Sequence, residues 1–211
     1  MINYQTSPRL KKRKYRYPGK ANNVCQNLLR IDPEELENYE IIFSDIFEFR
    51  LGDGSKIYCC FVIRKKTRQI ISFSFGYNMQ AGLVVDSVTN IQLINITNQN
   101  QVIFHSDQGR QFGAQMTIEK LIEYGITRSM SRAGTPTDNP IAERFVGIFK
   151  LAVVERYRYQ TLGEFQEFAE KWLNFYNTIR PHESLRMLSP NHYATIHNLE
   201  TASYLAVSCA H

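Results

Sequence analysis

The sequence lacks the features of a membrane, secreted or zinc-binding protein. Its four cysteines, Cys25, Cys59, Cys60 and Cys209, include no C-x-x-C pair and no histidine partner at zinc-ligand spacing. We therefore predict plain thiols, with Cys59 and Cys60 packed inside an apolar run. No apolar run approaches the roughly 20 residues that cross a bilayer, and the N-terminus has no apolar core of a secretory signal. We expect a cytoplasmic protein without a membrane span.

The composition is that of an ordinary folding chain. The 211 residues are 43% hydrophobic, 12% aromatic and 21% charged, which argues against a disordered protein. This length is enough for one domain with a proper core, and too short for two large ones. No internal repeat is present, so a repeat architecture is not indicated.

The basic residues are concentrated at the N-terminus. Residues 1–30 hold eight Lys or Arg and no acid, which leaves 17 basic against 20 acidic residues elsewhere, a net charge of −3. A basic arm on a slightly acidic body favours a polyanion partner, and Tyr15 and Tyr17 can stack on bases. A solvated tail is the alternative. Our candidates for nucleic-acid contacts in the arm are Lys11, Lys12, Arg13 and Lys14.

Hydrophobic patterning divides the chain into a basic arm and connecting segment over 1–38, a core over 39–160, and a C-terminal helix and tail over 161–211. Three β-rich runs with short turns predict an antiparallel meander: Tyr39–Arg50, Lys56–Ile63 and Gln69–Tyr77. Two further strands are expected, Gln101–His105 and Ile126–Arg128. Helices are expected near Asp32–Glu35, from Leu83 to about 97, at Phe112–Tyr124, from Pro140 to about Tyr157, and at Leu162–Asn177. This order predicts an α/β protein with the ribonuclease-H-like fold, a mixed five-stranded sheet flanked by helices.

Three acidic residues stand at positions where a carboxylate has chemical meaning. Asp45 alternates with Phe43 and Phe47 in an apolar strand, where an unpaired charge is costly and a metal or a basic partner is the usual remedy. Asp107 directly follows a strand, where open α/β sheets place functional groups. Glu143 lies one turn into a helix and shares a face with Lys150, two turns on. A salt bridge, a plain turn and a solvated helix face are the respective alternatives.

Asp and Glu oxygens, without any Cys or His, are ligands suited to Mg²⁺ or Mn²⁺. Two such ions about 4 Å apart can activate a water or hydroxyl and stabilise the leaving oxygen in an attack on a phosphodiester. Taken singly, each acid is weak evidence for such a site.

The chain resembles the DDE-type transposases and retroviral integrases, in particular bacterial insertion-sequence transposases whose catalytic part is a separate reading frame. Thirty-five residues separate Asp107 from Glu143, which is the spacing of that family's signature. The similarity covers about residues 14–195. The matching segments are NLLR at 27–30, HSDQG at 105–109, SMSRAG at 129–134, DNPIAERF at 138–145, YN at 176–177 and RPH at 180–182.

This resemblance implies cleavage of DNA at the ends of a mobile element and strand transfer into target DNA. Asp45 would bridge two Mg²⁺ or Mn²⁺ ions, Asp107 would complete one coordination shell, and Glu143 the other. Lys150 would contact DNA near the reacting phosphate, and Arg132 and Arg180 are further DNA-binding candidates. A homo-multimer on DNA and a separate helix-turn-helix partner protein are the expected partners.

The sequence departs from the family pattern at two places, with Ile42 where a tryptophan is usual and Arg64 where an acid is common. Neither position is a metal ligand. Two competing functions remain open: a nuclease of the same fold that only hydrolyses, and an inactive DNA-binding relic of a mobile element.

Overall fold

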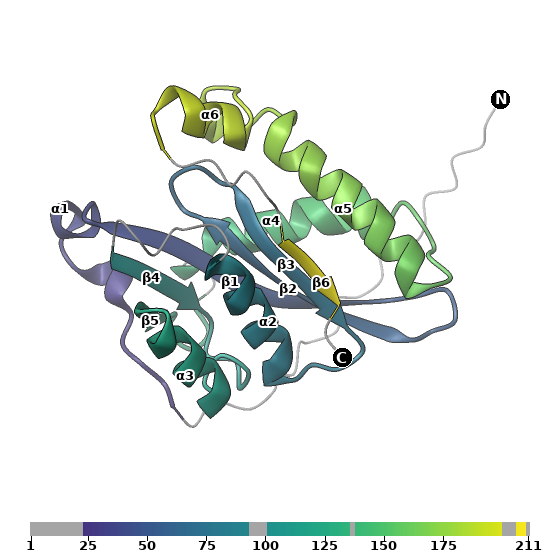
Figure 1. The fold of residues 1–211 in the computed structure, drawn as a ribbon, viewed down its shortest axis with the longest axis horizontal. Coiled ribbons are helices and arrows are strands. Elements are labelled where there is room, and N and C mark those ends of the chain that lie inside the picture. Colours follow the sequence, from purple (N-terminus) through teal and green to yellow (C-terminus); the bar gives the residue numbers. More distant parts are fainter. Residues whose placement is uncertain (1–22, 93–100, 136–137, 200–205, 210–211) are drawn as a thin grey trace.

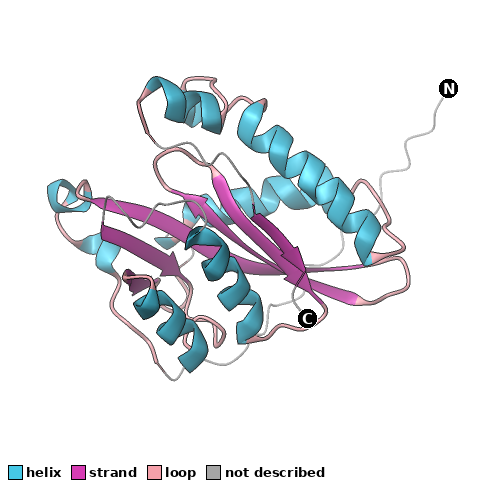
Figure 2. Cartoon of the chain, in the orientation of Figure 1, coloured by secondary structure: helices cyan, strands magenta, loops and turns pink. Residues whose placement is uncertain are grey.

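The computed structural model describes residues 23–92, 101–135, 138–199 and 206–209 and shows one twisted sheet with helices on both faces (Figures 1 and 2). The sheet has six strands in the order β5-β4-β1-β2-β3-β6. Their bounds are β1 Tyr39–Arg50, β2 Lys56–Arg64, β3 Ile70–Gly76, β4 Gln101–Ser106, β5 Ile126–Met130 and β6 Ala206–Cys209. The α/β, ribonuclease-H-like arrangement was predicted, but the expected five strands were wrong because β6 adds a sixth.

The sheet combines an antiparallel meander with parallel additions at both sides. Strands β1, β2 and β3 pair antiparallel through short turns, with Asp45 opposite Phe61 in the β1–β2 register. Strand β4 pairs parallel with β1, β5 parallel with β4, and β6 parallel with β3. Parallel neighbours need long connections, and the chain supplies helices for them. The middle of β1 therefore lies beside the carboxyl end of β4.

The helices fall into two layers (Figure 1). Helix α2 (Ala81–Gln92) and helix α3 (Gln115–Glu123) cover one face, while α4 (Pro140–Phe149) and α5 (Leu162–Thr178) cover the other. Period-two alternation divides β1 and β2 between the two cores, so Cys59 packs on the α4–α5 side and Cys60 on the α2–α3 side. Cys25, Cys59, Cys60 and Cys209 form no disulfide with one another, in line with the prediction.

The α4–α5 layer is rich in aromatic side chains. Phe149 lies 5.4 Å from Phe47 and 5.2 Å from Phe73, measured between ring centroids, and Phe145 lies 4.4 Å from Phe61. Such aromatic pairs add to the free energy gained from burial itself, by about 0.5–1.5 kcal/mol each. This packing fixes α4, and with it Glu143, against the sheet.

Shorter elements complete the fold. These are the 3₁₀ turn η1 Leu28–Arg30, helix α1 Pro33–Leu36, the π-helical turn η4 Lys150–Val154, the 3₁₀ turn η5 Glu183–Leu185 and helix α6 Pro190–Ile196. Helix α3 begins at Gln115, three residues later than expected, because the segment before it forms turns in which Phe112 is buried 6.1 Å from the Phe104 ring. No helix in the described part of the chain is long and apolar enough to cross a membrane.

Two sets of predictions fall outside the described residues. The arm candidates Lys11, Lys12, Arg13 and Lys14 are one set, and the expected end of the second helix at about residue 97 is the other.

Candidate active site

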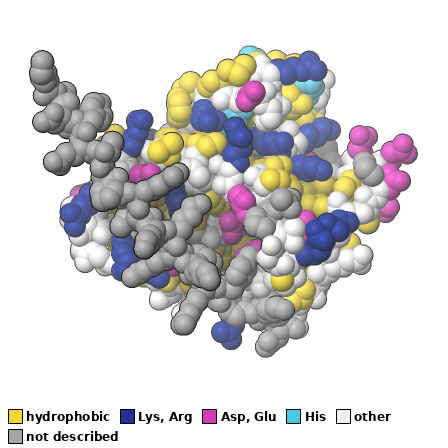
Figure 3. Space-filling model, turned by 180° about the vertical axis from the view of Figure 1, so that it is seen from behind, with side chains coloured by type: hydrophobic (Ala, Val, Ile, Leu, Met, Phe, Trp, Pro, Cys, Tyr) yellow, Lys and Arg dark blue, Asp and Glu magenta, His cyan; other side chains and the backbone are white. Residues whose placement is uncertain are grey.

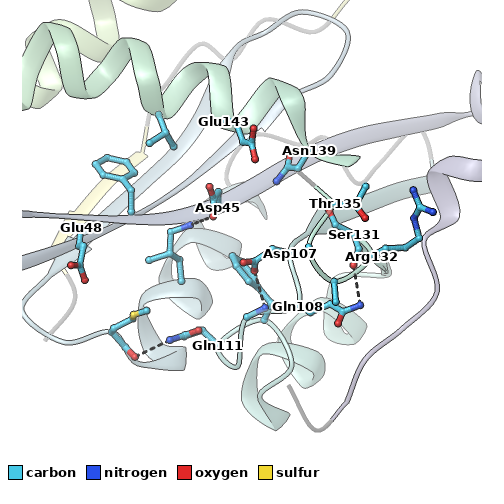
Figure 4. A pocket seen from close by; sticks show the side chains of 18 of the residues that line it. Asp45, Glu48, Asp107, Gln108, Gln111, Ser131, Arg132, Thr135, Asn139 and Glu143 are labelled. Atoms are coloured by element: carbon cyan, nitrogen blue, oxygen red, sulfur yellow. Dashed lines mark hydrogen bonds between the residues drawn. The ribbon is translucent and has the colours of Figure 1, made fainter. Parts of the chain in front are cut away.

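One cavity of about 780 Å³ opens where β1, the end of β4, the loop after β5 and helix α4 meet. Asp45, Asp107 and Glu143 all line it, each from a different element (Figure 4). Lys150 and Arg132 line the same cavity. The structure therefore brings together five of the predicted site residues, whereas Arg180 is not among the lining residues.

Asp45 lies in the middle of β1 on the same side of the strand as Phe43 and Phe47, as its alternation predicted. Its Oδ1 accepts a hydrogen bond of 2.7 Å from the backbone N–H of Ile46, and the described residues offer it no salt bridge. Burial, together with the nearby carboxylate of Asp107, raises the pKa of Asp45 to about 7. The side chain therefore holds its proton more tightly than an ordinary aspartate.

Asp107 follows the last residue of β4 and is held by the turn that it begins. Its Oδ1 accepts a hydrogen bond of 2.8 Å from the backbone N–H of Gly109. A Cβ atom at Gly109 would lie 2.8 Å from that same oxygen, so the close approach requires glycine. Burial raises the pKa of Asp107, and the Gly109 hydrogen bond lowers it. The turn thus orients the carboxylate toward the cavity.

Glu143 lies in the first turn of α4, which starts with Pro140. Proline is well suited to this position because its missing N–H would be unpaired there in any case. Lys150 lies two turns further along and lines the same cavity, as the spacing predicted. Its Nζ is 5.5 Å from the centre of the Phe47 ring, a cation–π contact. A carboxylate from α4 and an ammonium group from the adjoining π-helical turn η4 thus both face the cavity.

Asn139, directly before helix α4, lines the cavity and was not among the predicted site residues. Its side chain makes no capping hydrogen bond, and its Nδ2 donates to the backbone oxygen of Ser44 at 3.3 Å. Its Oδ1 is buried and has no hydrogen-bond partner among the described residues, although the residue lines the cavity. Buried polar atoms are nearly always paired, so this oxygen is a candidate ligand for a bound group. In the sequence, the only sign that Asn139 belongs to the site is its position four residues before Glu143.

His105 supports the loop that forms one wall of the cavity. Its two ring nitrogens lie 2.8 Å from the Ser129 hydroxyl and 3.0 Å from the Ser131 hydroxyl. Burial lowers the pKa of His105 to about 4, so the ring is neutral at pH 7. Gln108 adds a hydrogen bond of 3.0 Å from its Nε2 to the backbone oxygen of Ser131. The strand end that carries Asp107 and the loop that carries Arg132 are therefore tied together.

Asp138 joins the same loop to the segment before the sheet. Its carboxylate accepts hydrogen bonds from the backbone N–H and the Nε of Arg132, at 3.1 and 3.2 Å, and from the Nδ2 of Asn27 at 3.1 Å. Arg30 lies 3.8 Å away as an ion-pair partner. The hydrogen bond from the Arg132 side chain lowers the pKa of Asp138 most. Arg132 is thus held at the cavity rim by an acid that does not line the cavity.

The oxygen donors that line the cavity decide whether it can hold a divalent metal ion. Among the described residues, no three His, Cys, Asp or Glu side chains are gathered closely enough to hold one ion by themselves. The cavity nevertheless presents carboxylate and amide oxygens, the donors that Mg²⁺ and Mn²⁺ prefer. The raised pKa of Asp45 and the unpartnered Oδ1 of Asn139 are both relieved by a cation. The residues present therefore fit such an ion.

Sequence comparisons find integrase core domains and bacterial transposases that are similar to the chain. Family models described as "Integrase core domain" match residues 36–136 and 124–190. The putative transposase InsK of insertion element IS150 from Escherichia coli K12 is 27% identical over 185 residues, 87% of this chain and 65% of that protein. A transposase-like protein of Haemophilus influenzae is 29% identical over 188 residues, 88% of this chain and 85% of its own length. A third relative, the transposase of IS904 from Lactococcus lactis, is 31% identical over 129 residues, and the chain spans half of its length.

Solved structures show the same fold. A chain of the simian T-cell lymphotropic virus intasome superposes with a TM-score of 0.60 at 13% identity, covering 82% of this chain and 58% of that one. The HTLV-2 integrase catalytic core domain in complex with magnesium gives a TM-score of 0.54 at 16% identity, covering 72% and 93%. The chain belongs to the integrase core domain family, with the ribonuclease-H-like fold of DDE-type transposases and integrases.

Proposed function

We propose that this chain cleaves a DNA strand at the end of a mobile element and transfers the freed end to a second strand, in a metal-dependent reaction. The observation that carries the proposal is that Asp45, Asp107 and Glu143, from β1, the end of β4 and α4, face one cavity. The relatives named as transposases support it, although the chain spans 65% of the IS150 protein and about half of others.

The proposed cofactor is a pair of Mg²⁺ or Mn²⁺ ions. Asp45 would contribute to both, Asp107 to one and Glu143 to the other, with the free oxygen of Asn139 close at hand. When bound, the ions supply activation of an attacking water or 3′-hydroxyl and stabilisation of the leaving oxygen. The HTLV-2 core and the Mos1 catalytic domain are described with magnesium.

The remaining cavity residues position the DNA. Lys150 presents an ammonium group beside the carboxylates and would hold a phosphate next to the reacting one. Arg132, kept at the rim by Asp138, would contact the backbone from the opposite wall. The neutral His105 keeps this wall in place and adds no charge. These side chains bind and orient, while the carboxylates hold the metal.

The proposed partners are DNA, further copies of this chain and a DNA-recognition protein. A multimer on DNA is suggested by the likeness to a chain of a viral intasome. Recognition of the element ends would come from the basic arm, from a separate helix-turn-helix protein or from a segment beyond this chain. Each of these is part of the proposal.

The test is a combined cleavage and joining assay. A labelled duplex carrying the inverted repeats that flank the encoding gene is incubated with the protein, Mg²⁺ and a target duplex. We expect a nicked product and a longer joined product, both lost with EDTA. Nicked product alone would identify a nuclease that only hydrolyses, and DNA binding without any Mg²⁺-dependent product would identify an inactive relic.

A further inference from the structure

Three arginines from distant parts of the chain are close enough to Tyr176 and His182 to act on both by their charge, and none of them lines the carboxylate cavity. Arg68 comes from the β2–β3 turn, Arg144 from α4, and Arg180 from the segment that follows α5. We call this set the arginine cluster. Figure 3 shows one face of the molecule, on which several Lys and Arg side chains lie in the upper part.

The cluster is organised around two buried rings. The rings of Tyr176 and His182 meet edge to face with 4.7 Å between centroids. The guanidinium carbon of Arg180 lies 5.7 Å from the Tyr176 ring centre, and its Nη1 lies 3.3 Å from the Nε2 of His182. Burial, together with the positive charges of Arg180, Arg68 and Arg144, lowers the pKa of His182 to about 4. His182 therefore stays neutral and does not add to the charge.

The positive charge of the cluster has no acidic partner. Within the described ranges, none of the three arginines forms an ion pair with an aspartate or glutamate. Arg64, on the same hairpin as Arg68, behaves differently: its Nε donates to Glu40 at 2.8 Å in a buried pair. Arg68 and Arg180 are half-buried and Arg144 is exposed, and like charges brought close together repel one another. An anion between them would relieve that repulsion.

Arg68 adopts a strained backbone conformation in the cluster. Its φ is +61°, in the left-handed region that non-glycine residues rarely adopt, and its side chain donates to the backbone oxygen of Lys65. Strained residues of this kind persist where the surrounding structure demands them, often at ligand-binding places. Burial lowers the pKa of Arg68, which is further evidence that its charge is partly withdrawn from water.

We propose that the arginine cluster binds phosphates of a DNA backbone, as a second contact separate from the carboxylate cavity. A guanidinium group can donate two parallel hydrogen bonds to the oxygens of one phosphate. The buried, neutral rings of His182 and Tyr176 support the arginines from below. Arg144 directly follows Glu143 in α4, so one helix carries a cavity residue and a cluster residue side by side. The inference rests on the proposed function only in taking DNA as the ligand.

The test is DNA binding in EDTA, where no cutting occurs, so that the result does not depend on catalysis. The full chain and the double variant Arg144→Gln/Arg180→Gln are titrated with a duplex at several salt concentrations. We expect the variant to bind about tenfold more weakly at low salt, with a salt slope smaller by about 2, or roughly one per lost phosphate contact. Arg68 is left unchanged because its strained backbone makes substitution there hard to interpret.

The control is Arg156→Gln/Arg158→Gln, which removes the same charge from exposed positions after η4. Thermal melting establishes that both variants are folded. If the two double variants bind DNA equally well, the cluster is not a DNA site, whether or not it contacts an acidic protein. If the cluster variant alone loses binding while the unaltered chain cuts no DNA, the inference stands and the proposed function fails.

Discussion

Asp45 is a carboxylate on a strand face that otherwise carries phenylalanine, and its raised pKa is the energetic consequence of that position. The neighbouring strand offers only Phe61 opposite it, and the nearby charges of Asp107 and Glu143 are of the same sign. Such a group is stabilised by a proton or by a metal ion. The function proposed for it uses the metal.

Asp107→Asn should abolish strand cutting and leave DNA binding largely unchanged, because the amide keeps the size of the side chain and loses its charge. A gel assay of cleavage beside a filter-binding assay measures both. Glu48→Gln is the matched control, since Glu48 also lines the cavity but pairs with Lys56 at 3.0 Å. Undiminished cutting by Asp107→Asn would exclude this carboxylate as a metal ligand.

Mg²⁺ should stabilise the protein more at pH 8 than at pH 5.5, through Asp45. Its folded pKa of about 7 lies above the ordinary 3.8, so the metal-free fold loses stability as pH rises from 3.8 to 7, by at most about 4 kcal/mol. Above pH 7 the ionised carboxylate is free to bind the ion. Thermal melting with and without Mg²⁺ measures the effect.

The variant Asp45→Asn should melt higher than the unaltered protein in EDTA at pH 8, and should gain little from Mg²⁺. A lower melting temperature in EDTA would show that the ionised Asp45 carboxylate does not destabilise the metal-free fold.

His105→Gln should cost about 2 kcal/mol of stability at pH 7 and clearly less at pH 4.5. At neutral pH the variant loses packing and one or both serine contacts. The folded pKa of His105 is about 4 against an ordinary 6.5, so the unfolded chain binds more protons and stability falls as pH drops from 6.5 to 4. Glutamine has no such loss. Urea unfolding at the two pH values tests this, and an equal difference at both would contradict it.

Among the elements, those marked by strong local patterns could be predicted closely. The bounds of β1 matched to the residue, and β2 and α5 matched to within one residue, because alternation, apolar spacing and turn residues all agree there. The sixth strand could not be predicted. Ala206–Cys209 is four residues long, and only pairing with β3, far away in the chain, makes it a strand.

The site was predictable to a similar degree. Five of its residues stand in local motifs, but the free oxygen of Asn139, the buried Arg64–Glu40 pair and the arginine cluster depend on tertiary contacts that no local pattern reveals. At helix α3 the local pattern predicted helix where there is none, because the helix was expected from Phe112 and begins at Gln115. Phe112 fits a helical spacing, yet it is buried from a turn, since periodicity records burial and not backbone shape.

Helix α4 offers a test of element stability at Gly147, where a Cβ would meet no atom within 4 Å. Gly147→Ala should raise the melting temperature by about 2 °C, because alanine reduces the entropy lost on forming the helix. Gly125→Ala, with φ of +66° at the end of α3, should lower it because the left-handed conformation disfavours a Cβ. Calorimetry of both variants measures the two melting temperatures. Changes of the same sign would contradict the opposite effects expected at Gly147 and Gly125.

On the scale of the whole molecule, charge is unevenly distributed between the N-terminal arm and the body. Replacing Lys11, Lys12, Arg13 and Lys14 by glutamine should weaken DNA binding and reduce its salt slope by up to about 4, without changing the unfolding free energy. Lys120→Gln/Lys171→Gln is the control, since both lysines pair with acids on their own helices. Equal salt slopes for the arm variant and the unaltered chain would mean that the arm is a solvated tail.

The parallel pairing of β4 with β1 joins strands that β2, β3 and α2 separate along the chain, and this separation affects how the protein folds as it is synthesised. The meander of β1, β2 and β3 can form early from neighbouring segments, whereas Asp45 meets Asp107 only after β4 has been added, and Glu143 only after α4 has docked. Contacts between distant segments form slowly because a long loop must close first. A nascent chain stalled before residue 143 would therefore carry strands β1 to β5 without a complete set of carboxylates, and the proposed capacity to cut DNA would arise only late in synthesis.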